Sequence, residues 1–341
     1  MTKPKTPRTR FNPAELEPRS GNPTPSETLP VLFASAAKIA TFNAIYIHNP
    51  SHRRLLAALD QLMALAMATP GQRQSAVRSL APSGSGKTTT AEAFQMIVAK
   101  REGTGGASGK PHSVLIVPLE SGCSVRSLWV SINLRLGETM IKRGDTEETL
   151  RQRAYRAIER LGIKLVIIDE VQHLDSTRGR GDVTDSLKRV LDDGIVPLAF
   201  LGVKDAEPML RRNVQLANRM LPPADIRPLV AAKTQDHRDF EGFLSRLDAA
   251  MLKAKLVKQL SNFDDPLTAA CLMEVTQGVL GRATNLIRIA YRRAFCRAAD
   301  HVEICDLAWA TREWAIEQSL AVRNPFRVGL RLATLPTKDA A

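Results

Sequence analysis

The sequence predicts an α/β fold, a parallel sheet sandwiched by helices and followed by a small helical lid domain. Three observations support this prediction. Short apolar runs alternate with stretches of helical periodicity from about residue 50 to residue 230. These runs, such as Leu165–Ile168, are apolar at every position, which is typical of buried parallel strands. After about residue 232 only helical periodicity continues.

The expected elements follow from these patterns in chain order. Strands are expected at 76–80, 114–119, 165–168 and 196–201. Helices of the α/β part are expected at 51–68, 87–100, 124–142 and 146–161, and Pro70 and Gly71 end the first of them. Helices of the lid are expected at 236–260, 264–276, 282–298 and 303–318.

Composition divides the chain into four parts. Residues 1–28 are rich in Pro, Ser and Thr, and the first ten carry four cations and no acid, which predicts a flexible basic tail. The α/β nucleotide-binding domain is expected over 29–231 and the helical lid over 232–320. Residues 321–341 are again basic and contain proline, which predicts a second tail.

The charge balance and the cysteines limit the possible functions. The chain has 48 Lys and Arg against 35 Asp and Glu, a formal net charge of +13, which favours a polyanionic partner such as nucleic acid. The four cysteines form no close pair, which argues against a zinc site or a disulfide framework. No apolar stretch of about 18 residues occurs, so we expect a cytoplasmic protein without a membrane segment.

A glycine-rich turn between an expected strand and an expected helix predicts a phosphate site. Residues 81–88 read Ala-Pro-Ser-Gly-Ser-Gly-Lys-Thr and resemble the Walker A motif, with alanine in place of its first glycine. Glycines let backbone N–H groups surround phosphate oxygens, and the helix that follows directs its positive end at them. We expect ATP to contact Pro82, Ser83, Gly84, Ser85, Gly86, Lys87, Thr88 and Thr89.

An acidic pair at the end of the third apolar run predicts the other half of the site. Asp169 and Glu170 follow Leu165–Ile168, which is the Walker B pattern. A buried parallel strand delivers its last side chains to the sheet edge where ligands bind. We expect Thr88 and Asp169 to hold Mg²⁺ and Glu170 to act on the attacking water as a catalytic residue.

With these motifs the chain resembles the AAA+ P-loop ATPases, and within them the TniB/TnsC-type transposition regulators. The run 168–174 (Ile-Asp-Glu-Val-Gln-His-Leu) and the segments 194–202 and 215–219 carry the resemblance to the subfamily. The resemblance implies an ATPase whose ATP-bound subunits form a homo-oligomeric ring or filament on double-stranded DNA. That assembly would recruit a DDE transposase, and hydrolysis would drive disassembly.

Other ATPase classes remain open at this point. A helicase-loading or remodelling ATPase would show vigorous DNA-stimulated turnover, and a signalling ATPase would show no dependence on DNA. A small-molecule kinase is disfavoured, because an Asp-Glu pair after the second Walker strand suits water activation.

The resemblance also implies roles for two arginines, and the chain departs from the family pattern at one position. Arg219 looks like the trans-acting arginine finger, a catalytic residue, with Arg211 and Arg212 as rivals. Arg282 resembles the sensor-2 arginine that contacts nucleotide from the lid. The sensor-1 position falls on Val203, which cannot hydrogen-bond the water through its side chain. Hydrolysis is therefore expected to be slow or to depend on Lys204 or Asp205.

Candidate DNA contacts are Arg126, Lys142, Arg143, Arg178 and Arg180. Only 5% of the residues are aromatic, so base stacking is a poor mechanism. Binding is expected to involve mainly the DNA backbone, with weak sequence specificity and strong salt dependence.

Overall fold

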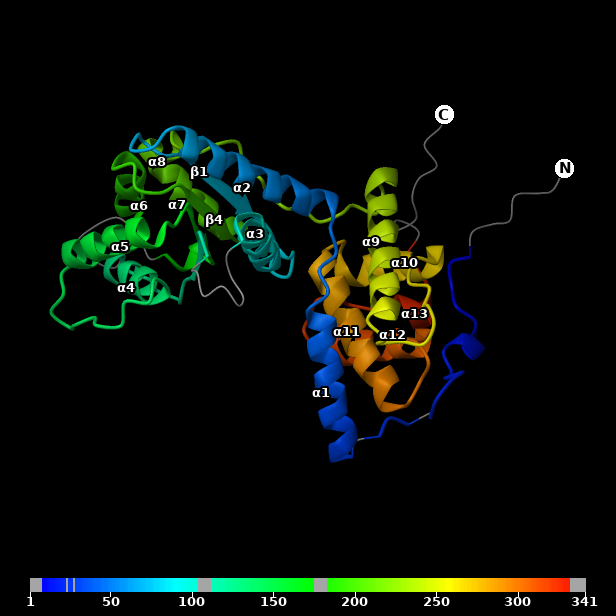
Figure 1. Cartoon of the computed structure of the whole chain (residues 1–341). Helices are drawn as coiled ribbons and strands as arrows, with labels where there is room; N and C mark the ends of the chain where they lie inside the picture. Colours follow the sequence, from blue (N-terminus) through cyan, green and yellow to red (C-terminus); the bar gives the residue numbers. More distant parts are fainter. Residues whose placement is uncertain (1–7, 23, 27, 104–111, 175–182, 332–341) are drawn as a thin grey trace. The chain divides into compact units, whose positions relative to one another are not determined.

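The computed structural model describes residues 8–22, 24–26, 28–103, 112–174 and 183–331 (Figure 1). The chain divides into two compact units. One is the continuous segment Pro50–Arg227, and the other combines residues 1–49 with residues 228–341.

The unit Pro50–Arg227 is built on a four-stranded parallel sheet. Its strands are β1 (Ala76–Leu80), β2 (Val114–Pro118), β3 (Leu165–Asp169) and β4 (Leu198–Gly202). They lie in the order β1-β4-β3-β2, so β3 and β4 are central. This agrees with the strands expected from the sequence, apart from two residues at the start of β4 and one residue at the ends of β2, β3 and β4.

Helices cover both faces of this sheet. One face is covered by α2 (Pro50–Ala68) and α3 (Lys87–Glu102). The other is covered by α4 (Val125–Arg135), α5 (Glu147–Leu161), α6 (Val183–Asp192), α7 (Glu207–Arg212) and α8 (Val214–Ala217). Successive strand residues point to opposite faces, so Ile167 packs toward α2 and α3 while Ile168 packs toward α4 and α6. This explains why the strands are apolar at every position.

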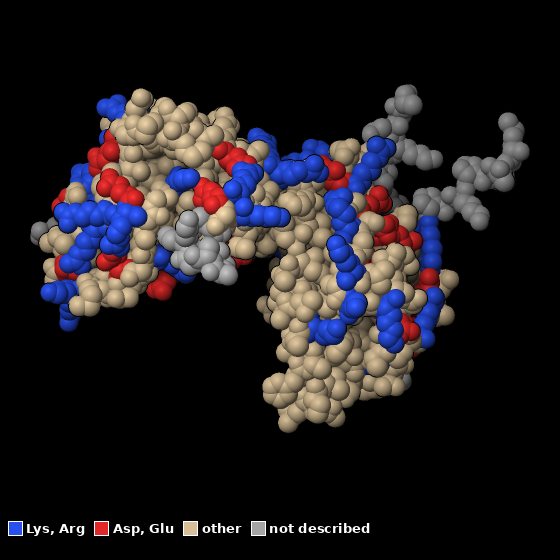
Figure 2. Space-filling view, viewed as in Figure 1, with Lys and Arg blue, Asp and Glu red and all other residues tan. Residues whose placement is uncertain are grey.

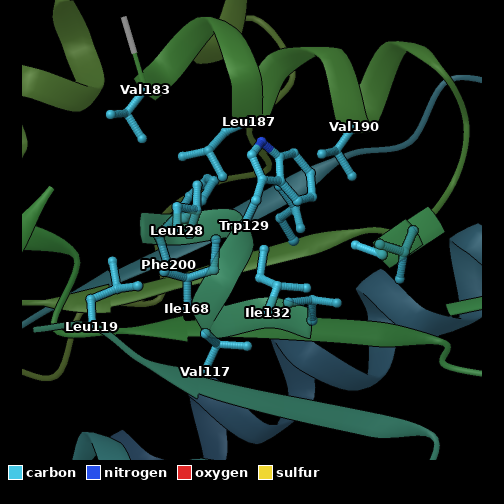
Figure 3. Close-up of a cluster of buried hydrophobic side chains, with 14 of the residues drawn as sticks. Val117, Leu119, Leu128, Trp129, Ile132, Ile168, Val183, Leu187, Val190 and Phe200 are labelled. Atoms are coloured by element: carbon cyan, nitrogen blue, oxygen red, sulfur yellow. The ribbon is translucent and has the colours of Figure 1, made fainter. Parts of the chain in front are cut away.

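Trp129 of α4 fills the space between α6 and the sheet (Figure 3). Its ring lies close to Leu187 and its indole N–H donates to the Ser186 hydroxyl at 3.0 Å, so the buried polar atom is satisfied. The predicted helix 124–142 ends earlier than expected, because Gly137 has a φ of 83° and a loop follows until α5.

The outer edge of β1 is covered by the segment 219–225. The amide of Ala76 donates to the Arg219 carbonyl at 2.9 Å, and the amide of Ala224 donates to the Arg78 carbonyl at 2.9 Å. The segment forms only an isolated parallel bridge between Ala76 and Met220. These bonds satisfy backbone groups that an open edge would expose.

The second unit is helical. It contains α1 (Leu29–Asn43), α9 (Thr234–Lys253), α10 (Pro266–Thr276), α11 (Leu280–Cys296), α12 (Ile304–Ala310), a π-helical turn (Thr311–Ile316) and α13 (Pro325–Val328). A short 3-10 turn, η1 (Pro13–Glu15), precedes them. The lid helices agree with the sequence expectation in number and order. No helix in the described part of the chain is long and apolar enough to cross a bilayer.

The two compact units differ from the domains expected from the sequence, both near the N-terminus and near the C-terminus of the chain. Residues 29–49 were expected in the α/β domain, but Phe42 of α1 stacks on Tyr291 of α11 at a ring distance of 6.1 Å. The expected tails also contribute to this core, since Phe11 stacks on Phe326 at 6.0 Å. The apolar residues in these segments could cover either unit, and sequence spacing does not say which.

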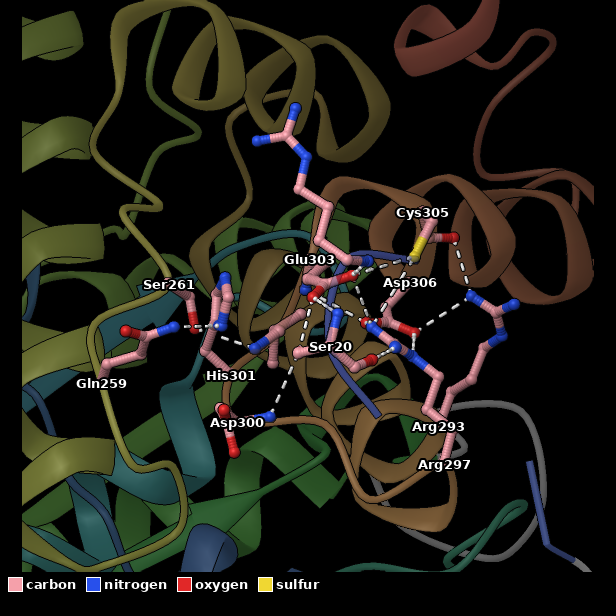
Figure 4. Close-up of polar contacts among 12 residues, drawn as sticks. Ser20, Gln259, Ser261, Arg293, Arg297, Asp300, His301, Glu303, Cys305 and Asp306 are labelled. Atoms are coloured by element: carbon pink, nitrogen blue, oxygen red, sulfur yellow. Dashed lines mark hydrogen bonds and ion pairs between the residues drawn. The ribbon is translucent and has the colours of Figure 1, made fainter. Parts of the chain in front are cut away.

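A buried ionic cluster fixes the segment 19–22 to this unit (Figure 4). The Arg297 guanidinium is fully buried and donates to Glu303 at 2.9 Å and to Asp306 at 2.7 Å. Glu303 accepts from the amide and hydroxyl of Ser20 at 2.8 and 2.6 Å. Burial raises the pKa of Glu303, but hydrogen bonds from Ser20 and the Arg19 amide, together with the charge of Arg297, bring it below its ordinary value. Residues 19–22 are therefore part of the fold.

Replacing Arg297 with alanine is expected to lower the free energy of unfolding by about 3–5 kcal/mol, because the buried Glu303 would lose its cation and the buried Asp306 would keep only Arg293. Urea unfolding followed by circular dichroism measures the change. The matched control is Arg312→Ala, whose ion pair with Glu313 is exposed and should matter by less than about 1 kcal/mol. Equal effects of the two substitutions would contradict a structural role for the cluster.

Candidate nucleotide-binding site

The carboxyl ends of β1 and β3 bring the glycine-rich turn and the acidic pair together. The turn follows β1 directly and leads into α3, and β3 ends at Asp169. The Thr88 hydroxyl, in the first turn of α3, donates to Asp169 Oδ2 at 2.6 Å. Two segments 81 residues apart in the sequence therefore meet at one point of the sheet edge.

The turn has the backbone conformation that a phosphate cradle needs. Gly84 and Gly86 have φ values of 77° and 86°, in the region that favours glycine. Gly86 is the N-cap of α3, so the first amides of this helix have no intrahelical acceptor and point into the turn. Ala81 is buried, has no positive φ and donates its amide to the Gly202 carbonyl at 3.0 Å. The alanine therefore causes no backbone strain.

Lys87 is buried within the turn. Its ammonium donates to the carbonyls of Ala81 at 2.9 Å and Pro82 at 3.2 Å. Burial lowers the pKa of Lys87, while the charges of Glu170 and Asp169 raise it and only partly offset that effect. Because burial outweighs the two carboxylates, the charged form of Lys87 remains destabilised. A bound phosphate would add negative charge beside the ammonium and stabilise it.

Asp169 and Glu170 differ in their surroundings. Asp169 is buried, with Oδ2 bonded to Thr88 and Oδ1 accepting the Glu170 amide at 2.9 Å. Glu170 has a φ of 59° and a ψ of 41°, a left-handed conformation that costs a residue with a side chain about 1 kcal/mol. This conformation turns the chain from β3 into a 3-10 turn, η3 (Val171–His173), and separates the directions of the two acids.

Two further residues contact this site and were not found from the sequence. His52 of α2 has Nε2 3.1 Å from the Ser85 carbonyl, and a Cβ at Gly86 would lie 3.0 Å from its ring. Gln172 of η3 hydrogen-bonds the Glu170 carboxylate. His52 belongs to no motif, and Gln172 lies in the run 168–174 without a role assigned from it, because each acts on the site through the packing of a different element.

The residues fit a metal-bound triphosphate. A hydroxyl and a carboxylate, from Thr88 and Asp169, are the oxygen ligands that Mg²⁺ takes beside phosphate oxygens. Ser83, Thr88 and Thr89 are exposed at the mouth of the turn, whereas Ser85 is buried beneath it. Among the described residues no group of three His, Cys, Asp or Glu could hold a metal ion by itself.

The three candidate finger arginines have different surroundings. The Arg219 carbonyl is bonded at the start of β1, and its guanidinium pairs with Asp192 at 2.9 Å. Arg211 is 71% exposed and pairs with Glu207 at 2.7 Å, and Arg212 is exposed at the end of α7. Since β1 spans five residues, roughly 16 Å, the Arg219 backbone is at the opposite end of β1 from the turn that contains Lys87.

The two sensor positions have different local environments. Arg282 lies in the first turn of α11 and donates to the Gln277 side chain at 3.2 Å. Val203 follows β4, and its amide donates to Gln172 Oε1 at 3.1 Å. Lys204 and Asp205 are exposed in the 3-10 turn η4 (Lys204–Ala206).

The candidate DNA contacts fall into three groups. Arg126 donates to the carbonyls of Lys142, Arg143 and Asp145 at 3.1, 3.2 and 3.4 Å, so it holds the α4–α5 loop instead of facing solvent freely. Lys142 and Arg143 are exposed on that loop. Arg178 and Arg180 lie outside the described residues. Lys and Arg side chains gather over α4, α5 and this loop in Figure 2.

Comparisons with known proteins identify the family and the fold. The model of the family described as "Bacterial TniB protein" matches residues 38–225, more than half of the chain. A search of curated protein sequences gave no significant match.

Solved structures show the same fold. Cdc6p from Pyrobaculum aerophilum is similar with a TM-score of 0.54 and 14% identity, over 80% of this chain and 70% of that one. The ADP form of the ORC2 protein from Aeropyrum pernix is similar with a TM-score of 0.60 and 15% identity, over 80% and 72%. The fold is therefore that of the AAA+ P-loop ATPases.

Proposed function

Because the chain belongs to the bacterial TniB family, we propose that it is an ATP-dependent, DNA-binding transposition regulator. ATP would assemble it on target DNA, where it recruits a DDE transposase, and hydrolysis would release it. The observation that carries the nucleotide part is the 2.6 Å bond between Thr88 and Asp169, which joins the phosphate turn to the acidic strand end. Family membership supports the transposition part.

Each side chain of the site has a distinct task in this proposal. The amides of the turn and Lys87 bind the β- and γ-phosphates of ATP. Thr88 and Asp169 hold Mg²⁺, which when bound neutralises charge that develops on the phosphates. Glu170 orients the attacking water and accepts its proton. Arg282 contacts the nucleotide from the helical unit.

Arg219 is proposed to complete the site of a neighbouring subunit. Its position beside the start of β1 is unsuitable for the chain's own nucleotide and suits a surface that meets the next subunit. A polar groove lies beside it, lined by Asp185, Arg189, Asp192, Arg212 and Gln215. In the free chain Asp192 holds the guanidinium, so assembly would exchange this ion pair for the γ-phosphate of the neighbour.

The Arg219→Ala variant is expected to lose roughly 10³-fold in the hydrolysis rate of the assembled protein. Mixing it with Glu170→Gln should restore hydrolysis above that of either variant alone, because one subunit supplies the arginine and the other the glutamate. Phosphate release measures both effects. Arg211→Ala and Arg212→Ala, mixed in the same way, test the rival arginines, and absence of rescue with Arg219→Ala would exclude it as the finger.

The α4–α5 loop is proposed to contact the DNA backbone. Arg126 binds three of its carbonyls, and Arg153 donates to Met140 O at 3.0 Å and to Asp145 at 2.9 Å. These bonds fix the loop backbone, while the side chains of Lys142 and Arg143 remain exposed. A fixed loop with outward cations loses little conformational entropy on binding phosphates.

Replacing Lys142 and Arg143 together with alanine is expected to weaken binding to duplex DNA similarly for all sequences. The slope of log affinity against log salt should fall by about 2, one unit for each lost phosphate contact. Fluorescence anisotropy across salt concentrations measures it. The control is Arg101→Ala, whose side chain is exposed but already paired with Asp60. An unchanged slope would remove the loop from the DNA interface.

Electron microscopy of the protein with duplex DNA and either ATP or ADP tests the proposed function. Filaments or rings on DNA that form with ATP and not with ADP are the expected result, and Lys87→Ala should abolish them. Adding the transposase should then place it on the ATP-bound assembly. Rings of fixed size with fast DNA-stimulated turnover would instead indicate a remodelling or helicase-loading ATPase.

A further inference from the structure

Gln172 connects the ends of the two central strands. β3 ends at Asp169 and β4 ends at Gly202, and these strands are neighbours in the sheet. The Gln172 side chain lies between them, with Nε2 donating to Glu170 Oε2 and Oε1 accepting the Val203 amide at 3.1 Å. A backbone amide can only donate, so the Gln172 oxygen must face Val203 and its NH₂ group must face Glu170.

Gly202 provides the space that Gln172 occupies. A Cβ at this position would lie 2.7 Å from Gln172 Oε1 and 2.7 Å from Val171 Cγ1, closer than atoms of this kind approach. Gly202 has no positive φ, so its backbone conformation does not require glycine. Its lack of a side chain is therefore explained by the close packing of η3 against the end of β4.

The Gln172 side chain places a polar group at the end of β4, where Val203 has an apolar side chain. Val203 follows β4 and has no side chain that hydrogen-bonds, yet its amide is tied through Gln172 to the Glu170 carboxylate. A carboxylate has about four acceptor sites and the glutamine uses one of them. Glu170 therefore keeps capacity to accept a proton from water while its orientation is fixed.

We propose that Gln172 is a positioning residue for ATP hydrolysis, acting by holding the Glu170 carboxylate in its reactive orientation. The proposal rests on the proposed ATPase function. In the reaction a water oxygen forms a bond to the γ-phosphorus, and the bond from that phosphorus to the bridging oxygen breaks with its electron pair leaving on ADP. The water proton passes to Glu170. Gln172 does not touch the reacting atoms.

The first test is Gln172→Ala. The turnover number is expected to fall roughly 10- to 100-fold, because a freely rotating carboxylate is seldom in place. The affinity for a fluorescent ATP analogue should stay within about twofold, since the hydrogen bonds of Gln172 go to Glu170 and Val203, which lie outside the phosphate turn. The matched control is Gln152→Ala, because Gln152 also donates to a glutamate, Glu148, but on the surface of α5.

Three additional variants test the mechanism, and the first two serve if Gln172→Ala folds poorly. Gln172→Glu keeps an acceptor for the Val203 amide but places a second carboxylate against Glu170, so it should lower turnover at least as much. Gly202→Ala should displace the glutamine and lower turnover with Gln172 still present. In a Glu170→Gln background, Gln172→Ala should cause no further loss, because it acts through that carboxylate.

Hydrogen–deuterium exchange gives a readout that does not depend on activity. Without nucleotide, the Val203 amide should exchange faster in Gln172→Ala than in the wild type, and it should be unchanged in Gln152→Ala. A wild type that binds no ATP would refute the proposed function itself. A wild type that hydrolyses ATP, with Gln172→Ala equally fast or faster, would overturn only the role of Gln172.

Discussion

Replacing Lys87 with alanine is expected to weaken ATP binding roughly 100-fold or more. The Lys87 ammonium is buried, and this burial is the main reason that its pKa is lowered. Bound phosphates would supply negative charge that stabilises the ammonium. Losing charge-assisted hydrogen bonds to two phosphates corresponds to about 3 kcal/mol, or about two orders of magnitude in affinity. Titration calorimetry with ATP and Mg²⁺ measures the loss.

Lys100→Ala is the matched control for this experiment. Lys100 lies on the same helix, α3, and is exposed near its C-terminus. It should leave ATP affinity unchanged, and circular dichroism should show that both variants are folded. If Lys87→Ala bound ATP within threefold of the wild type, the turn would not be the phosphate site.

Replacing Glu170 with glutamine is expected to separate binding from hydrolysis. The amide cannot accept the proton of the attacking water, so the hydrolysis rate should fall by about 10²- to 10⁴-fold. Thr88, Asp169 and Lys87 remain, so ATP should still bind. The variant should therefore accumulate as ATP-bound assemblies on DNA that do not disassemble.

Phosphate release and microscopy of the same sample measure the two parts of this prediction. The control is Glu92→Gln, which removes an exposed carboxylate from α3 without touching the site. Loss of both binding and hydrolysis in Glu170→Gln would contradict the division of roles between Glu170 and Asp169.

The parts of the site that lie on the two motifs could be predicted from sequence. Glycines at 84 and 86 and a lysine and threonine at the start of a helix carry their chemistry in short segments, and the structure places Thr88 against Asp169. The same local reasoning did not predict what Arg126 bonds within the protein. A basic residue near other basic residues resembles a DNA contact, but its guanidinium binds loop carbonyls 16 to 19 residues away.

The domain boundaries also show what local sequence patterns predict and what they do not. Helical periodicity predicted α2, α3, α4, α5 and the lid helices, because it reports which face of each helix is apolar, but it predicted neither α1 nor α6. It did not predict that α1 belongs to the helical unit, since the partner of an apolar face is chosen in three dimensions. The segment 19–22 has the composition of a flexible tail, yet the buried Arg297–Glu303 pair holds it.

The sequence by itself determined the four strands in chain order, many of the helices, the phosphate turn, the acidic pair and the family, because each depends on residues that are close together in the chain. Only the tertiary structure decided that Gln172 ties Glu170 to the end of β4, that His52 supports the turn, and that Arg219 lies beside the start of β1. These contacts join segments tens of residues apart, and packing of the sheet and its helices, which no local pattern encodes, brings them together.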